Sequence, residues 1–208
     1  MNRIEHREEK WAFPFIEYSP ENKRENMPII IQLHGAGGRG SGKEDLSLVD
    51  TYCFAKIMDE EYDCIFIMPQ CPKNEFWPAR TESVIKFVEQ IIDEFKPDVK
   101  RISLTGYSMG AYGTWFAAMT RPDLFSAIAP VSGGGMAWTA SVLDMPIWAF
   151  HGEADKTVTP VHTREMVEKL QKLGKNVRYT EFPGVGHGLQ PLAFTKELLH
   201  WLLEQKRA

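Results

Sequence analysis

A serine between two glycines is the residue whose surroundings most favour chemistry in this sequence. Residues 106–110 read Gly-Tyr-Ser-Met-Gly, between an apolar run and a segment of helical character that starts near Met109. A sharp strand-to-helix turn holds such a serine in a strained backbone conformation, and a Cβ at either glycine position would clash. The hydroxyl is lifted above the sheet, where the N–H of Met109 points into the same space. The pattern therefore predicts a nucleophilic Ser108 rather than a serine that only caps a helix.

A serine hydroxyl becomes nucleophilic when a base takes its proton, and the base needs an acid that orients it. His187 is the best candidate base, because it stands in a glycine-rich loop between the last predicted strand and the last predicted helix. The other histidines fall in the charged N-terminus, on predicted helices, or before a glycine at a strand end, where bracing a loop is the simpler role: His6, His162, His200, His34 and His151. We therefore expect His187 to accept the serine proton.

Asp155 is the candidate acid, because it follows the apolar run 146–150 and precedes a predicted helix. From that position it would face the serine at the C-terminal ends of the strands. The alternative is an ordinary aspartate in a turn or at a helix entry. Glu153 is the second candidate acid, whereas Asp144 precedes the strand and so lies at its wrong end. Serine, aspartate and histidine follow one another along the chain in the order expected of one particular fold.

The glycine-rich segment 35–44 invites a nucleotide-binding interpretation. Residues 35–40 fit a dinucleotide fingerprint, and residues 37–43 fit most of a phosphate-binding loop. Both interpretations fail on context, because Glu44 stands where Ser or Thr should reach Mg²⁺ and the next strand ends without an acidic residue. Both motifs also need a helix to begin at once, which a glycine-rich stretch disfavours. The segment is better suited to presenting backbone N–H groups to an anion.

Short apolar runs alternate with segments of helical periodicity from residue 28 onward. The runs are apolar on both faces and bounded by Gly or Pro, which is typical of strands buried in a parallel sheet: 27–34, 64–69, 101–106, 127–131, 146–150 and 177–182. Helices are predicted over 83–95, 109–120, 160–173 and 191–205. This alternation predicts an α/β fold, a doubly wound and mostly parallel sheet with helices on both faces, with residues 1–208 as one domain. Residues 11–18 are expected to add an antiparallel strand at one edge.

Composition excludes several classes of protein. The 208 residues are 43% hydrophobic and 25% charged, which is enough for a sizeable core and rules out wholesale disorder. A net charge of −4 gives no sign of the basic surface that binding to nucleic acid or an anionic membrane requires. There is no apolar run of the ~20 residues that a membrane span needs, and the charged first ten residues do not resemble a signal peptide. The three cysteines, Cys53, Cys64 and Cys71, suit reduced thiols, so a cytoplasmic location is expected.

With these motifs in this order, the sequence resembles the α/β-hydrolase superfamily. It is most similar to the small carboxylesterase group that includes phospholipase/carboxylesterases, dienelactone-hydrolase-like enzymes and depolymerase-type esterases. The resemblance covers residues 28–205 and is carried by the segments 33–37, 106–110, 151–155 and 186–188. It implies that Ser108 attacks an ester carbonyl, that His187 accepts and returns the proton, and that Asp155 holds the imidazolium.

The resemblance also implies an oxyanion hole, formed by the N–H of Met109 together with that of Ala36 or, alternatively, Gly37. It implies no metal and no cofactor. Only residues 132–145 separate two core strands, so we expect no cap domain and an open site. A loop containing Trp77 borders the pocket in related esterases, so Trp77 is a candidate pocket wall, and bracing that loop is its alternative role. Met136 and Trp138 are weaker candidates of the same kind.

The sequence thus predicts a serine carboxylic-ester hydrolase acting on short-chain or small aromatic esters. A thioesterase or a peptidase of the same fold is the alternative, because these reactions share the oxyanion and differ in the leaving group. A non-catalytic binding protein on a hydrolase scaffold is the alternative from another class. The expected partner is a small-molecule ester, with no nucleic acid and no membrane. The oligomeric state stays open, a homodimer included.

Overall fold

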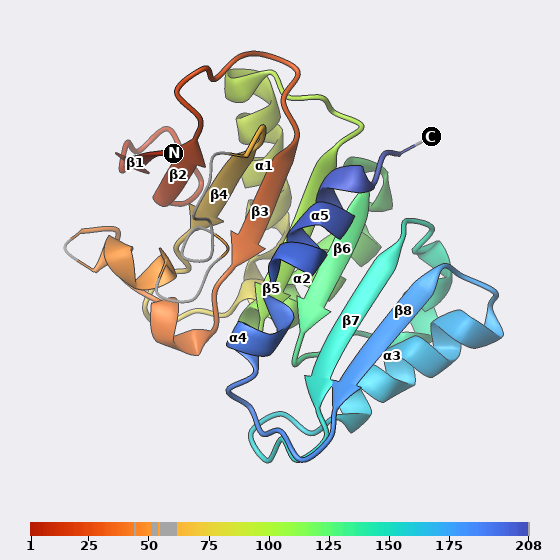
Figure 1. The fold of residues 1–208 in the computed structure, drawn as a ribbon. Helices are drawn as coiled ribbons and strands as arrows, with labels where there is room; N and C mark the ends of the chain where they lie inside the picture. The colour runs from red at the N-terminus through yellow and green to blue at the C-terminus, as the bar shows by residue number, and fades with distance from the viewer. Residues whose placement is uncertain (44, 51–53, 55–61, 208) are drawn as a thin grey trace.

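An eight-stranded sheet forms the centre of the computed structural model, which describes residues 1–207 other than 44, 51–53 and 55–61 (Figure 1). Its strand order is β1-β2-β4-β3-β5-β6-β7-β8. The strands are β1 Asn2–His6, β2 Phe15–Ser19, β3 Ile29–Leu33, β4 Ile65–Pro69, β5 Ile102–Tyr107, β6 Ala127–Val131, β7 Ile147–Gly152 and β8 Val177–Phe182. The strands from β3 to β8 run parallel to one another. β2 pairs antiparallel with β4, and β1 pairs antiparallel with β2. The predicted doubly wound α/β sheet is confirmed.

The central strands are continuously apolar because both faces of the sheet are covered by helices. In β3, Ile29, Ile31 and Leu33 pack into one core cluster, whereas Ile30 packs into a second cluster on the opposite face. This is the alternation that a strand imposes on successive side chains. A strand buried on both faces therefore reads as an unbroken apolar run.

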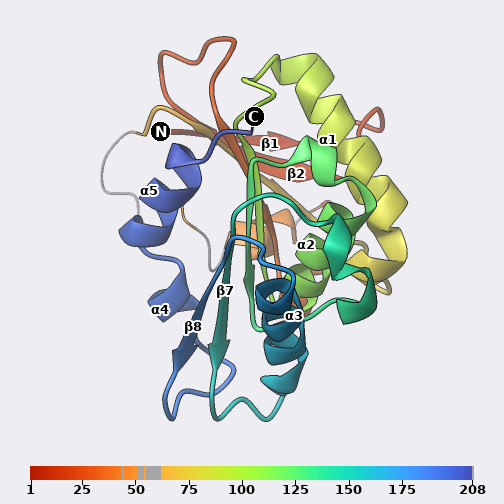
Figure 2. The ribbon, with the colours of Figure 1, turned by 90° about the vertical axis from the view of Figure 1, so that its right-hand side faces the viewer.

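The helices form a layer on each face of the sheet. Figure 2 shows α1 Thr81–Phe95, α2 Met109–Thr120 and α3 Val161–Lys172 on one side, with α4 Gln190–Ala193 and α5 Lys196–Glu204 on the other. In α1, Val84, Phe87, Val88 and Ile91 lie along one buried stripe, as the periodicity predicts. Because the strands are parallel, the loops at their C-terminal ends all gather at one edge of the sheet, where the conserved geometry of such folds places ligand sites.

Two elements differ from the prediction. The expected antiparallel edge strand over 11–18 is β2, but it lies second, because the charged residues 2–6 pair with it as β1. Exposed charges along β1 suit an outermost strand, since they discourage further pairing. The single helix predicted over 191–205 is divided into α4 and α5. Thr195 adopts an extended conformation between them, and its side chain accepts a hydrogen bond from the N–H of Leu198.

Residues 132–145 form no cap over the site. They contain a short 3₁₀ helix, η6 Ala137–Val142, which packs against α3 and α2. Trp138 lies on this helix and is 75% exposed. No helix among the described residues is long and apolar enough to cross a membrane. Cys64 and Cys71 are buried, and burial raises the pKa of both thiols, that of Cys71 to about 11; Cys53 lies outside the described residues.

Candidate active site

Ser108 occupies a strained turn between β5 and α2. Its φ of 55° and ψ of −117° lie in a region that L-residues rarely adopt, so the surrounding contacts must hold it there. The turn is possible because two backbone segments touch at the flanking glycines. A Cβ on Gly106 would lie 2.3 Å from the carbonyl oxygen of Gly110, and one on Gly110 would lie 2.0 Å from the carbonyl oxygen of Leu33. Both glycines are therefore required by geometry.

Replacing Gly110 with alanine should lower the free energy of unfolding by about 3 kcal/mol or more, because backbone atoms rather than flexible side chains occupy the space. Denaturant unfolding measures the loss. Gly37→Ala is the matched control, because a Cβ there meets nothing within 4 Å. Equal stability of the two variants would show that the turn is not packed as described.

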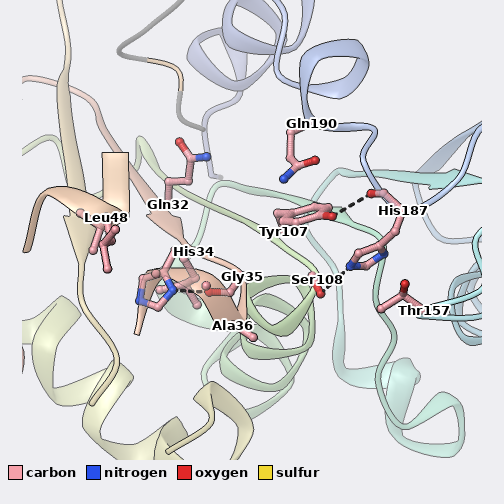
Figure 3. A pocket seen from close by; sticks show the side chains of 14 residues that line it. Gln32, His34, Gly35, Ala36, Leu48, Tyr107, Ser108, Thr157, His187 and Gln190 are labelled. Atoms are coloured by element: carbon pink, nitrogen blue, oxygen red, sulfur yellow. Dashed lines mark hydrogen bonds between the residues drawn. The ribbon is translucent and has the colours of Figure 1, made fainter. Parts of the chain in front are cut away.

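The structure brings Ser108, His187 and Asp155 into one hydrogen-bonded chain. The Oγ of Ser108 lies 2.9 Å from Nε2 of His187, and Nδ1 of His187 lies 2.7 Å from Oδ2 of Asp155. Figure 3 shows the ring of His187 directed at the serine. The histidine comes from the β8–α4 loop and the aspartate from the β7–α3 loop, so three separate strand ends meet here.

The carboxylate of Asp155 is held in its ionised form. Burial opposes ionisation, but the hydrogen bond from His187 and the backbone N–H groups outweigh it and lower the pKa of Asp155. Its Oδ1 atom accepts the N–H of Thr157 at 2.9 Å and that of Val158 at 3.0 Å. The carboxylate of Asp155 can therefore accept a hydrogen bond from a protonated His187 ring while the two backbone N–H groups keep it in place.

The alternative acids lie elsewhere. The Oε2 of Glu153 accepts the N–H of Gly184, which ties it to the loop that carries His187. Asp144 pairs with Lys175 at 3.1 Å and precedes β7, at the opposite end of that strand. Neither carboxylate is hydrogen-bonded to the ring of His187.

The candidate oxyanion loop is held by His34. Its Nε2 accepts the N–H of Cys71 at 2.9 Å, and its Nδ1 donates to the carbonyl oxygen of Gly35 at 2.6 Å. The next residues form a 3₁₀ turn, η1 Ala36–Gly38, and α2 begins at Met109. The first N–H groups of a helix have no partner inside it, so both elements present amide donors at their starts. Ala36 lines the same cavity as Ser108.

His34 should make stability fall on acidification. Burial lowers the pKa of His34 to about 4 from an ordinary 6.5. Above pH 6.5 neither the folded nor the unfolded chain binds this proton, so stability is full there. As the pH falls toward 4, the unfolded chain takes up a proton that the folded chain does not yet bind. At pH 5 this difference lowers the free energy of unfolding by about 2 kcal/mol. Urea unfolding at pH 7 and pH 5 should show a smaller difference in His34→Gln than in wild type; an equal difference would contradict this role.

Trp77 does not form a wall of the cavity beside Ser108. It begins the 3₁₀ helix η4 Trp77–Arg80, is fully buried, and does not line the cavity that contains Ser108. Its Nε1 donates to the carbonyl oxygen of His34 at 3.0 Å, and its ring packs against Phe13. The large ring fills the core beneath the loop that follows His34, so the pocket-wall prediction is wrong and the bracing alternative describes its place.

A cavity of about 480 Å³ opens beside Ser108. Leu48 and Val49 form an apolar wall, and Gln32 and Gln190 add amide groups (Figure 3). Among the described residues that line it there is no Asp, Glu, Lys or Arg. Tyr107 also lines it and donates its hydroxyl to the carbonyl oxygen of His187 at 2.7 Å. The site is therefore suited to an uncharged ligand with both apolar and hydrogen-bonding parts.

Four of these lining residues were not predicted from the sequence: Gln32, Leu48, Val49 and Gln190. Gln32 is a polar residue within an otherwise apolar strand, a signal that could have drawn attention to it. Leu48 and Val49 belong to the 3₁₀ helix η2 Leu46–Asp50, which follows the glycine-rich segment 35–44 and carries no pattern that marks these residues. Met136 and Trp138 do not line this cavity. Within the described part of the chain, no group of His, Cys, Asp and Glu could hold a metal ion.

Comparison with known proteins assigns the family. Residues 17–129, more than half of the chain, match the model of the family described as BD-FAE. The chain belongs to the BD-FAE family. Residues 135–206 of this BD-FAE protein also match the prolyl oligopeptidase family model. Together with the structural neighbours below, these matches confirm the resemblance to the α/β-hydrolase serine esterases.

Several relatives of this BD-FAE protein carry esterase names. Acetylxylan esterase A of Emericella nidulans is 28% identical over 148 residues, covering 68% of this chain and 45% of that protein. Poly(3-hydroxyalkanoate) depolymerase C of Paucimonas lemoignei is 23% identical over 203 residues, covering 74% of this chain and 47% of that protein. The chain spans about half or less of the length of the curated relatives it matches.

Solved structures agree with this fold. A thermostable esterase superposes with a TM-score of 0.86 at 31% identity, covering 99% of this chain and 63% of that chain. The acetyl xylan esterase of Aspergillus awamori has a TM-score of 0.75 at 16% identity, covering 97% and 99% of the two chains. The second likeness shows the fold alone.

Proposed function

We propose that this BD-FAE protein is a serine carboxylic-ester hydrolase with Ser108 as nucleophile, His187 as general base and Asp155 as the orienting acid. The observation that carries the proposal is the chain of short hydrogen bonds from Ser108 through His187 to Asp155 beside an uncharged cavity. The esterase names of its relatives support the same reaction class.

In the first half of the reaction, Ser108 Oγ attacks the ester carbonyl while Nε2 of His187 takes the hydroxyl proton. Negative charge develops on the carbonyl oxygen, which the N–H groups of Met109 and Ala36 stabilise, with Gly37 as the alternative donor. Collapse of the intermediate breaks the bond to the alcohol, and His187 returns the proton to the leaving oxygen.

In the second half, water attacks the acyl-enzyme and passes its proton to His187. The tetrahedral intermediate then breaks its bond to Ser108 Oγ, and His187 returns the proton to the serine. Asp155 stays ionised throughout and stabilises the imidazolium that forms twice in each cycle. The carboxylic acid leaves, and the resting enzyme is restored.

The cavity favours short acyl chains or small aromatic groups. An acetyl group fills only a small part of the 480 Å³, so the rest can hold an aromatic group or a neutral alcohol. Relatives named acetylxylan esterases make an acetylated sugar a suitable substrate class to test. The amides of Gln32 and Gln190 can hydrogen-bond uncharged hydroxyl groups without needing a charged substrate.

A peptidase is the second candidate. The match of residues 135–206 to the prolyl oligopeptidase family, and the fold shared with an acylaminoacyl peptidase of Pyrococcus horikoshii, favour testing it. The same nucleophile and oxyanion donors serve amide cleavage, and the leaving group is selected by the pocket.

The deciding experiment combines an ester panel with covalent labelling. Hydrolysis of p-nitrophenyl esters from acetate to laurate should be fastest for the short chains, because no cap encloses a long one. A fluorophosphonate should add one label, which mass spectrometry locates on the peptide that contains Ser108. Labelling without ester turnover would favour the peptidase, tested with an acylated peptide. The absence of both would overturn the proposed function.

A further inference from the structure

A second histidine lies directly behind Asp155, and the proposed function does not use it. His151 is fully buried near the end of β7. Its Nε2 lies 2.9 Å from the carbonyl oxygen of Val158 and 3.3 Å from Oδ2 of Asp155, and its Nδ1 lies 2.7 Å from the hydroxyl oxygen of Thr163. The ring is thus held on one side by α3 and on the other by the loop that carries Asp155.

The partners of this ring decide which nitrogen carries the proton. The carbonyl of Val158 and the ionised carboxylate of Asp155 only accept hydrogen bonds, so a bare Nε2 would face two oxygens. The hydroxyl of Thr163 can donate to Nδ1, or accept from it while donating to the carbonyl of Gly133. Nδ1 therefore tolerates either state, whereas Nε2 requires a proton. Burial lowers the pKa of His151, which favours a neutral ring protonated on Nε2.

This proton completes the surroundings of the carboxylate. Oδ1 of Asp155 accepts two backbone N–H groups, from Thr157 and Val158. Oδ2 faces Nδ1 of His187 at 2.7 Å and Nε2 of His151 at 3.3 Å. Oδ1 therefore has two backbone donors, and Oδ2 has the His187 donor with Nε2 of His151 beside it, so rotation of the carboxylate would break several contacts at once.

We propose that His151 is a positioning residue; this proposal rests on the proposed function. The Nε2–H of His151 orients Asp155 and weakens the electrostatic attraction between that carboxylate and the protonated ring of His187. A donor on the far side of Oδ2 draws negative charge away from the side that faces His187. The imidazolium of His187 that forms after proton transfer from Ser108 then gives up its Nε2 proton more readily to the leaving alcohol. His151 acts through Asp155 and touches neither the serine nor the cavity.

Two titratable groups on neighbouring elements face His151 and Asp155. Glu181 on β8 faces His151 and pairs with Arg164 of α3 at 2.6 Å, which keeps it ionised and satisfied. Tyr112 on α2 faces Asp155, and burial followed by the charge of that carboxylate raises the pKa of Tyr112, so its hydroxyl stays neutral. Neither group competes for the Nε2 proton of His151.

Two amide variants distinguish the role of Nε2 of His151 from that of Nδ1. His151→Gln can bring an N–H to the position of Nε2, whereas His151→Asn reaches only the Nδ1 side. We expect kcat for p-nitrophenyl acetate to fall about tenfold in H151N, the scale of an orienting partner, with little change in KM. The acid limb of its pH profile should move to higher pH, because Asp155 holds a proton on His187 more strongly. H151Q should recover part of both effects.

Thr163→Val is the matched control for structure, because it removes the Nδ1 anchor and leaves the Nε2 side intact. It should lower the thermal midpoint and leave the acid limb in place. An acid limb that does not move in H151N would overturn the proposal. Losses of activity in H151N and H151Q that merely follow their losses of thermal stability would also overturn it.

The ¹⁵N NMR signals of His151 in the resting protein test the proposal without any turnover. A protonated Nε2 is expected at neutral pH, and an unprotonated Nε2 would overturn the inference even if esters are hydrolysed rapidly. Conversely, a protonated Nε2 in a protein that neither hydrolyses esters nor takes the phosphonate label would leave the hydrogen bond correct and overturn the proposed function.

Discussion

Replacing Ser108 with alanine is expected to lower kcat for p-nitrophenyl acetate by on the order of 10⁶-fold, because no other group can form the acyl-enzyme. The loss should fall on kcat and kcat/KM together, since the cavity beside the serine is unchanged. Residual hydrolysis above the uncatalysed rate would come from the oxyanion donors and binding alone. Initial rates and phosphonate labelling of the purified variant measure both effects.

Ser141→Ala is the matched control for this variant. Ser141 is an exposed serine on η6 and lies apart from the cavity, so its loss should change neither rate nor labelling. Activity that survives in S108A, with the label found at another serine, would show that the nucleophile is misassigned.

Replacing Asp155 with asparagine is expected to lower kcat on the order of 10⁴-fold while the protein stays folded. Each oxygen of this carboxylate faces hydrogen-bond donors, so an amide NH₂ must face donors on one side. If it faces His187, the ring must accept on Nδ1 and carry its proton on Nε2. His187 can then no longer take the proton of Ser108.

The pH dependence of D155N distinguishes this cause from simple damage. At high pH the concentration of hydroxide rises, and hydroxide can take over part of the role of His187 as base, so the ratio of wild-type to variant rates should shrink as pH rises. Glu153→Gln is the matched acid control and should cost less than tenfold, because Glu153 only accepts the N–H of Gly184. A larger loss in E153Q than in D155N would contradict the assignment of the acid.

Much of this architecture follows from local sequence pattern. Runs such as Ile29–Leu33 and Ile65–Pro69 are apolar on both faces, and a segment of that kind can satisfy its backbone and bury its side chains only inside a covered sheet. The glycines around Ser108 indicate the sharp turn because a Cβ would meet backbone atoms there. The chain order of serine, aspartate and histidine then restricts which strand ends can supply the partners. These features depend on a few neighbouring residues, which is why they can be predicted.

Helix boundaries and strand order were less accessible. The apolar spacing of residues 191–205 continues across Thr195, but the chain must turn there to bring both α4 and α5 onto one face of the sheet. Likewise, the charged segment 2–6 has no apolar pattern of its own and becomes β1 only because β2 offers it an unpaired edge.

The surroundings of the site were decided by packing between segments that are far apart in the sequence. Trp77 reads equally well as a pocket wall or a brace, and the core beneath the loop of His34 has the space that makes it a brace. Leu48 reaches the cavity from an unmarked segment, and His151 meets Asp155 only because the chain bends back after β7. The sequence by itself determined the fold class and the order of the candidate catalytic residues, because these rest on periodicity and local backbone sterics. The tertiary structure alone decided the cavity walls and the partners of each buried polar group, because these depend on residues far apart in the chain.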